Sequence, residues 1–128
     1  MILIFGSLLG FVSVAFGAFA EHGLRENISE EHFRFLMTAV RYNQIHAVVV
    51  TAIGIALING GKIATIPFFK LSGLTFAIGT ALFSFSIYLS VWLNLPGLLN
   101  ITPIGGVTIM ISWLLLLLTG LSILKDYK

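Results

Sequence analysis

The sequence predicts an all-α, polytopic membrane protein with four transmembrane helices, and three segments without charged side chains carry this prediction. Residues 71–124 run for 54 positions without a single Asp, Glu, Lys, Arg or His. Residues 1–20 and 42–61 also lack Asp, Glu, Lys and Arg. Because an α-helix rises about 1.5 Å per residue, roughly 20 apolar residues cross the hydrocarbon core. The long segment therefore accommodates two spans, and each of the shorter segments accommodates one.

The overall composition agrees with a membrane protein and excludes other classes. Hydrophobic residues make up 58% of the 128 residues and charged residues only 9%. A soluble helical bundle needs polar outer faces, which residues 71–124 cannot supply. The small net charge of +2 does not provide a nucleic-acid surface. We expect one integral-membrane domain over residues 1–128, without a separate soluble domain.

The first span covers residues 2–20. Its end, Ala18-Phe19-Ala20, resembles a signal-peptidase site, so a cleaved signal peptide is the alternative interpretation. Signal peptides carry basic residues before the apolar run, and no Lys or Arg precedes this one. We therefore interpret the segment as a retained transmembrane helix.

The second span, residues 42–59, is preceded by a charged segment with the pattern of an amphipathic helix. Ser29 is a plausible N-cap for that helix. Gly60 and Gly61 are expected to end the second span. The apolar residues of the charged segment recur at helical spacing, at Phe33, Leu36, Met37 and Val40. The pattern predicts a short amphipathic helix that feeds directly into the second span.

The third and fourth spans cover residues 69–93 and 103–124. Pro96-Gly97 and Asn100 mark the turn between them. Pro103 fits the first turn of the fourth helix, where its missing N–H costs no hydrogen bond.

Small residues recur at helical spacing in three of the spans. Lipid tails are as apolar as leucine, so membrane helices associate through close backbone approach at such residues. We expect one protomer to be unable to use all three stripes, and the stripe of the first span to mediate a homo-oligomer, a dimer or a trimer. The stripes are Gly6, Gly10, Ser13 and Gly17; Gly73, Ala77, Thr80 and Ser84; and Gly105, Thr108, Ser112 and Thr119.

Four crossings place most polar residues at one end of the molecule. The end of the first span, the start of the second, the end of the third and the start of the fourth share one membrane face. Polar groups within a span are costly unless they are paired, so we expect Arg41, Asn43 and His46 to find partners there. The predicted polar cluster comprises Glu21, His22, Arg41, Asn43, His46, Ser84, Ser86 and Tyr88.

Four ordered motifs resemble the YwdK/YgdD-like family of small membrane proteins, the family called domain of unknown function 423. The motifs are residues 17–24 (GAFAEHGL), 42–47 (YNQIHA), 83–88 (FSFSIY) and 101–106 (ITPIGG). The first usually reads GAFGAHGL in the family, so this chain adds the carboxylate of Glu21, and Phe85 stands where the third motif usually has a glycine. The resemblance covers essentially the whole chain. It implies a four-span membrane protein and no established activity.

The polar residues do not form a recognised catalytic or metal-binding motif. His22 and His46 could be ligands of a metal or a haem, but a structural hydrogen-bonding role is the favoured interpretation for both. Glu21 with Arg41 suits a helix-end ion pair better than an ion gate. Ser84 or Ser86 with His46 is the only nucleophile–base combination. We therefore predict no catalytic, cofactor-binding or metal-binding residues and no cofactor.

The function expected from the sequence is non-enzymatic. We expect the protein to act by helix packing with itself, with lipid or with a membrane partner. The alternative is a binder or carrier of a small amphipathic ligand, a lipid or a quinone, whose head group occupies the polar end.

The protein is expected in a bacterial cell membrane with both termini in the cytoplasm. The expected orientation rests on a slight excess of cations on the face that holds the termini. That face carries Lys62, Lys70, Lys125 and Lys128, against Arg25, Arg34 and Arg41 on the other.

Overall fold

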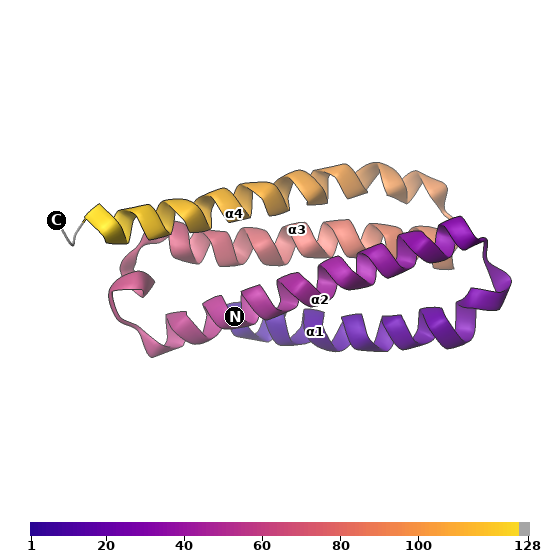
Figure 1. The fold of residues 1–128 in the computed structure, drawn as a ribbon, viewed down its shortest axis with the longest axis horizontal. Helices are drawn as coiled ribbons and strands as arrows, with labels where there is room; N and C mark the ends of the chain where they lie inside the picture. The colour runs from indigo at the N-terminus through magenta and orange to yellow at the C-terminus, as the bar shows by residue number, and fades with distance from the viewer. Residues whose placement is uncertain (126–128) are drawn as a thin grey trace.

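The protein forms four long antiparallel helices in a computed structural model that describes residues 1–125 (Figure 1). The helices are α1 (Ile2–Phe19), α2 (Glu30–Asn59), α3 (Pro67–Trp92) and α4 (Thr102–Lys125). Each of them, with its adjoining helical turns, is long and apolar enough to cross a membrane. The described residues contain no β-strand. The predicted fold class is therefore confirmed.

Short helical turns connect the four helices and extend two of the predicted spans. α1 continues beyond residue 20 into η1 (Ala20–Leu24), a π-helical turn, which is followed by η2 (Arg25–Asn27). The turn η3 (Lys62–Thr65) joins α2 to α3, and η4 (Pro96–Ile101) leads into α4. Figure 1 places η1, η2 and η4 at one end of the molecule and η3 with the end of α4 at the other.

Local signals fix where α2 begins and ends. The Ser29 side-chain oxygen accepts a hydrogen bond of 3.2 Å from the backbone N–H of His32, so the predicted N-cap is confirmed. Gly60 and Gly61 end the helix with φ values of 75° and 85°, which only glycine adopts without strain. The predicted amphipathic segment forms the first turns of α2 and runs into the second span without a break.

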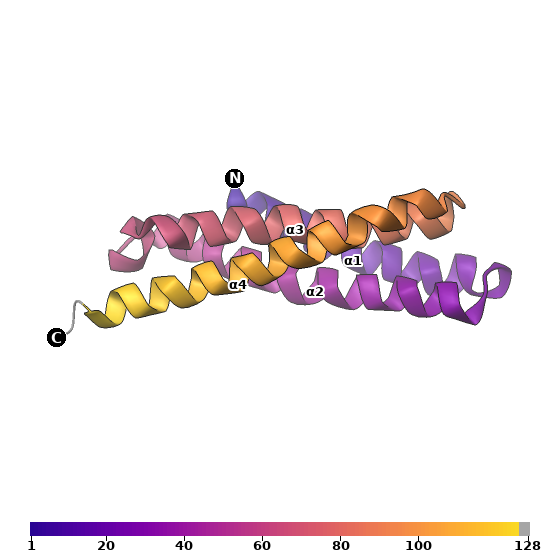
Figure 2. The ribbon, with the colours of Figure 1, turned by 90° about the horizontal axis from the view of Figure 1, so that it is seen from above.

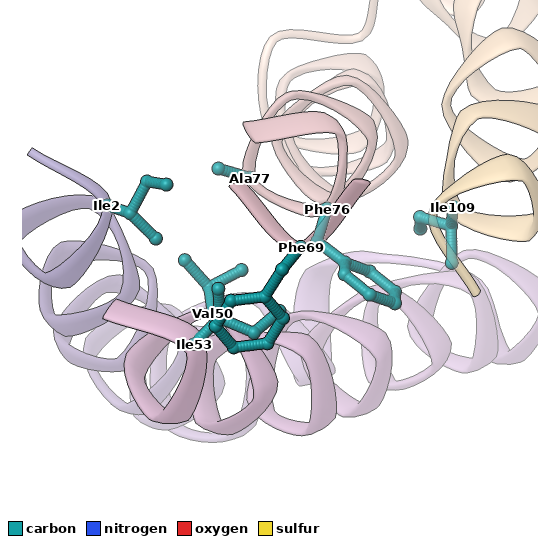
Figure 3. Close-up of a cluster of buried hydrophobic side chains, with 7 residues drawn as sticks. All are labelled: Ile2, Val50, Ile53, Phe69, Phe76, Ala77 and Ile109. Atoms are coloured by element: carbon teal, nitrogen blue, oxygen red, sulfur yellow. The ribbon is translucent and has the colours of Figure 1, made fainter. Parts of the chain in front are cut away.

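α2 and α3 form the centre of the bundle, with α1 packed on α2 and α4 packed on α3 (Figures 1 and 2). Two hydrophobic clusters hold these layers together. The cluster in Figure 3 receives side chains from all four helices. Its buried members are Ile2, Val50, Ile53, Phe69, Phe76, Ala77 and Ile109.

α1 and α2 cross at a pair of glycines. A Cβ atom at Gly6 would lie 2.6 Å from the amide nitrogen of Thr51, and one at Gly54 would lie 2.6 Å from the Cα atom of Leu3. Real Cβ atoms essentially never approach a backbone atom this closely. The absence of both side chains is therefore what lets the two backbones touch.

α3 and α4 cross in the same way. A Cβ atom at Gly105 would lie 2.8 Å from the carbonyl oxygen of Gly79, and one at Gly79 would lie 3.0 Å from the amide nitrogen of Ile109. Gly73, on another side of α3, gives room to Ile53 and Ile2, since its Cβ would lie 2.8 Å from Cγ2 of Ile53. α3 thus packs against α4 at Gly79 and against α2 and α1 at Gly73.

These contacts correct the expectation that the α1 stripe is left over for self-association. Gly6 and Ser13 are buried within the protomer, and Gly10 and Gly17 face Ala47 and Val40 of α2. The stripes of α3 and α4 are likewise used inside the molecule. One protomer can absorb all three because α2 and α3 each contribute a further glycine, Gly54 and Gly79, at the crossings.

The crossing of α3 and α4 gives a direct test by alanine substitution. We expect Gly105→Ala to lower stability by about 1–3 kcal/mol, because the helices must move apart to admit the methyl group. Gly120→Ala is the matched control in the same helix, since nothing lies within 4 Å of its Cβ position. It should leave stability unchanged or slightly raised. Thermal unfolding in detergent measures both; equal losses for the two variants would contradict the tight crossing.

Candidate functional site

The structure divides the predicted polar cluster into separate parts. Asn43, Ser84 and Tyr88 lie together, buried between α2 and α3. The Asn43 side-chain amide donates to the Tyr88 hydroxyl at 3.3 Å, and the Ser84 hydroxyl donates to the Ala39 carbonyl at 3.1 Å. The Tyr88 ring also stacks on Phe16 of α1, with 4.0 Å between ring centroids. This inner part therefore joins three helices.

Two buried polar atoms next to this inner part have no hydrogen-bond partner among the described residues. They are Oδ1 of Asn43 and the hydroxyl oxygen of Thr80. Ser84 lies opposite Ala39 and Phe76 lies against His46, so Thr80 is about level with Asn43. Because Oδ1 of Asn43 is buried without a partner, the bond to Tyr88 is the one side-chain hydrogen bond that the Asn43 amide makes. Its loss would leave the whole buried amide unpaired, which would lower stability.

Ser86 belongs to a second contact, between α3 and the start of α4. Its hydroxyl donates to the Phe83 carbonyl at 2.9 Å and lies 2.7 Å from the hydroxyl of Thr102. Because the Ser86 proton is used by the carbonyl, Thr102 is the donor in the second bond. Both serines are therefore engaged in helix contacts.

His46 lies in an aromatic contact rather than in the polar cluster. Its Nδ1 is 2.7 Å from the Tyr42 carbonyl oxygen, and because a carbonyl only accepts, Nδ1 carries the proton. The ring stacks on Phe76 at 5.6 Å and meets Trp113 edge-on at 6.3 Å. His46 is therefore not in the predicted polar cluster, and its ring contacts connect α2 to α3 and α4.

The three remaining predicted residues lie at the surface of the polar end. Glu21 forms an ion pair with Arg25, whose guanidinium also lies 4.8 Å from the centre of the Phe33 ring. The π-helical turn keeps Glu21 and Arg25 one turn apart, which corrects the expected pairing of Glu21 with Arg41. Arg41 is exposed and has no acidic partner within residues 1–125, and His22 is exposed. In that part of the chain no three His, Asp or Glu side chains gather closely enough to hold a metal ion.

An apolar groove runs between α1 and α2 toward Arg41. Its first stretch has a volume of about 650 Å³, and small residues of both helices line it, among them Gly10, Ala47 and Thr51. A second stretch of about 410 Å³ continues past Gly17 and Val40. We call these two stretches together the α1–α2 groove. Residues shared by both stretches make it continuous: Ser13, Val14 and Gln44.

The groove is long enough for an extended hydrocarbon chain. It follows α2 for about 21 Å from Ile55 to Arg41, at the rise of an α-helix, and continues one turn further to Met37. Its walls are mainly aliphatic; Gln44 lies where the two stretches join, and Arg41 lines the outer stretch. An open apolar groove with a cation near one end suits a molecule with an apolar chain and a polar head.

Sequence reasoning had identified Arg41 but not the groove. The missing signal lies in α2, where Ala47 and Thr51 are small residues that face the glycine stripe of α1. Small residues on both helices leave a depression along the line where they meet.

The contribution of the Asn43–Tyr88 bond can be measured with two tyrosine variants. We expect Tyr88→Phe to lower stability by about 1–2 kcal/mol, because Asn43 then loses its one side-chain partner while remaining buried. Tyr42→Phe is the matched control, since the Tyr42 side chain is exposed. Thermal unfolding compares the two; a loss in Tyr42→Phe as large as that in Tyr88→Phe would count against the account.

A second pair of variants tests the role assigned to His46. If the ring acts by packing on Phe76 and Trp113, His46→Phe should retain most of the stability that His46→Ala loses. The expected loss for alanine is about 1–3 kcal/mol. A Soret band in the purified wild type that is absent from both variants would show that His46 is instead a haem ligand.

Comparison with known proteins identifies relatives of similar length. The family model described as "Protein of unknown function (DUF423)" matches residues 16–106. The chain is 34% identical to a UPF0382 membrane protein of Haemophilus influenzae, over 84% of this chain and 83% of that protein. It is 31% identical to the UPF0382 inner membrane protein YgdD of Escherichia coli K12, over 90% and 85%. It is 30% identical to the UPF0382 membrane protein YwdK of Bacillus subtilis, over 95% and 97%.

No solved structure matches the chain with significant similarity. The family match covers more than half of the chain, and the relatives align over most of their lengths. Their names describe bacterial membrane proteins, in agreement with the four apolar helices. The chain therefore belongs to the DUF423 family of membrane proteins of unknown function.

Proposed function

We propose that this protein is a non-enzymatic binder of an amphipathic membrane molecule, which it holds in the α1–α2 groove with the head group at Arg41. The observation that carries the proposal is the continuity of the groove, from apolar walls at Ile55 to an exposed cation in its outer stretch. Hydrocarbon chains and head groups are arranged in the same order in a bilayer leaflet. A ligand from the membrane can therefore enter sideways without turning over.

Binding is favoured over helix packing as the activity because the tightest glycine crossings are already used within one protomer. Gly6 and Gly54 meet each other's helices, and so do Gly79 and Gly105. The serines closest to a nucleophile–base arrangement donate to backbone carbonyls, which supports a role other than catalysis. Homo-oligomerisation as a dimer or trimer stays a prediction.

For the orientation in the membrane, we propose that both termini lie in the cytoplasm. The helix ends near η3 carry Lys62 and Lys70, and α4 ends at Lys125 on the same side. Lys128, the fourth cation counted for this face, lies outside the described residues. This orientation places the mouth of the groove in the outer leaflet of the bacterial membrane.

Blocking the groove tests the proposed function. Gly10→Leu extends a side chain from a position whose Cβ would meet only Cβ of Ala47, at 3.8 Å. We expect this variant to fold and to lose most of the ligand that mass spectrometry finds on the wild type after release from detergent. Gly106→Leu is the matched control, because its Cβ also makes only ordinary contacts, with the Phe83 ring at 3.8 Å.

The comparison of the two leucine variants decides the outcome. Retention of ligand by Gly106→Leu and its loss from Gly10→Leu is the expected result. A wild-type protein that carries no bound molecule, or equal retention by both variants, would reject the α1–α2 groove as the binding site.

A further inference from the structure

We infer that the occupant of the α1–α2 groove is a phospholipid with a net negative charge, whose phosphate contacts Arg41 and whose acyl chain lies along the groove. This inference rests on the proposed function and adds the chemical class of the ligand. It follows from the arrangement of charged residues around the mouth of the groove.

The first argument is that Arg41 is a cation available for an anionic ligand. It lines the groove, is exposed, and has no ion-pair partner among residues 1–125. A guanidinium binds phosphate through a planar fork of N–H donors, and the amide of Gln44 on the same wall can add a further donor. Both groups lie where a lipid phosphate meets the outer end of its chain.

The second argument is that no Asp or Glu among residues 1–125 lines the outer stretch of the groove, where the cationic end of a zwitterionic head group would lie. Glu21, the acid one turn beyond Gly17, is already engaged by Arg25. Glu30 and Glu31 lie at the start of α2, about 15 Å from Arg41 along the helix. Charges separated by more than about 8–10 Å are largely screened at physiological ionic strength. An ammonium beside the phosphate would therefore remain unpaired.

The third argument is that the next charge along α2 toward solvent is also a cation. Arg34 is exposed and lines a depression of about 500 Å³ beyond the mouth of the groove, together with Phe33, Met37, Glu30 and Glu31. Arg34 lies about two turns from Arg41 and the two glutamates lie about one turn further away, so the charge on α2 nearest to Arg41 is a second cation. Anionic head groups are favoured by such cations, by about fivefold for each one near the membrane surface.

The experiment compares three lipids that share acyl chains and differ in head-group charge. Detergent-solubilised, delipidated protein is mixed separately with phosphatidylglycerol, phosphatidylethanolamine or diacylglycerol, and retained lipid is counted by native mass spectrometry. We expect phosphatidylglycerol to be retained most. Arg41→Gln should reduce its retention about fivefold, reduce that of phosphatidylethanolamine less, and leave that of diacylglycerol, which has no phosphate, unchanged.

Three further variants and one soluble ligand serve as controls. Arg41→Lys keeps the positive charge and should restore much of the preference, which separates loss of charge from misfolding. Lys125→Gln removes an exposed cation at the other end of the molecule and should have no effect. Gly10→Leu should reduce retention of all three lipids, because it fills the part of the groove that holds the chain. Glycerol 1-phosphate, which carries the phosphate without a chain, should not compete at the concentration at which the lipid binds.

The outcomes separate the head-group inference from the proposed function. Equal retention of the three lipids, unaffected by Arg41→Gln but lost in Gly10→Leu, would reject the anionic head group and keep the groove. Retention of none of them, with no other bound molecule on the purified wild type, would reject both. Competition by glycerol 1-phosphate as strong as that by the lipid would show an anion site that needs no chain.

Discussion

Close backbone contact at glycine pairs is the constraint on which the rest of this structure depends. Apolar helices gain no hydrophobic free energy when they exchange lipid contacts for contacts with one another. They therefore associate only where their surfaces fit closely or form hydrogen bonds. Gly6, Gly54 and Gly105 bring neighbouring backbones to distances that a side chain would not allow, and Gly79 faces Gly105 at the second crossing. These two crossings fix the vertical register of α1 on α2 and of α4 on α3. The bonds from Asn43 to Tyr88 and from Ser84 to Ala39 then fix α2 against α3.

The same geometry explains why the bundle carries a groove. α1 and α2 touch through their backbones at Gly6 but only through side chains at Gly10 and Gly17, where the nearest atoms are 3.8 Å and 3.3 Å from the Cβ positions. Figure 1 shows the two helices separating toward η1. Small residues line the widening gap, and Arg41 stands at its polar end. Helix packing therefore produces a surface that is apolar along its length and cationic at its mouth.

The sequence was sufficient to predict the four helices, because the length of a segment without charged residues can be read from that segment alone. It was also sufficient for the N-cap at Ser29 and for the end of α2 at Gly60, where each signal acts on its own residues. It was insufficient to predict which side chains contact each other. Glu21 binds Arg25 rather than Arg41 because a π-helical turn follows α1, and His46 finds Phe76 and Trp113 because of the register of three helices. Whether the α1 stripe packs inside the protomer depends on which residues of α2 lie opposite it. The spacing of small residues within α1 does not contain that information.

The central claim, that the α1 stripe is used inside one protomer, is tested most directly by cross-linking. The chain has no cysteine, and the Cβ positions of Gly10 and Ala47 are 3.8 Å apart, the distance that a disulfide requires. A Gly10→Cys/Ala47→Cys variant oxidised in its native membrane should form the disulfide within one chain and migrate as a monomer. Covalent dimers of that variant in place of the internal bond would contradict the account. So would covalent dimers of Gly10→Cys alone.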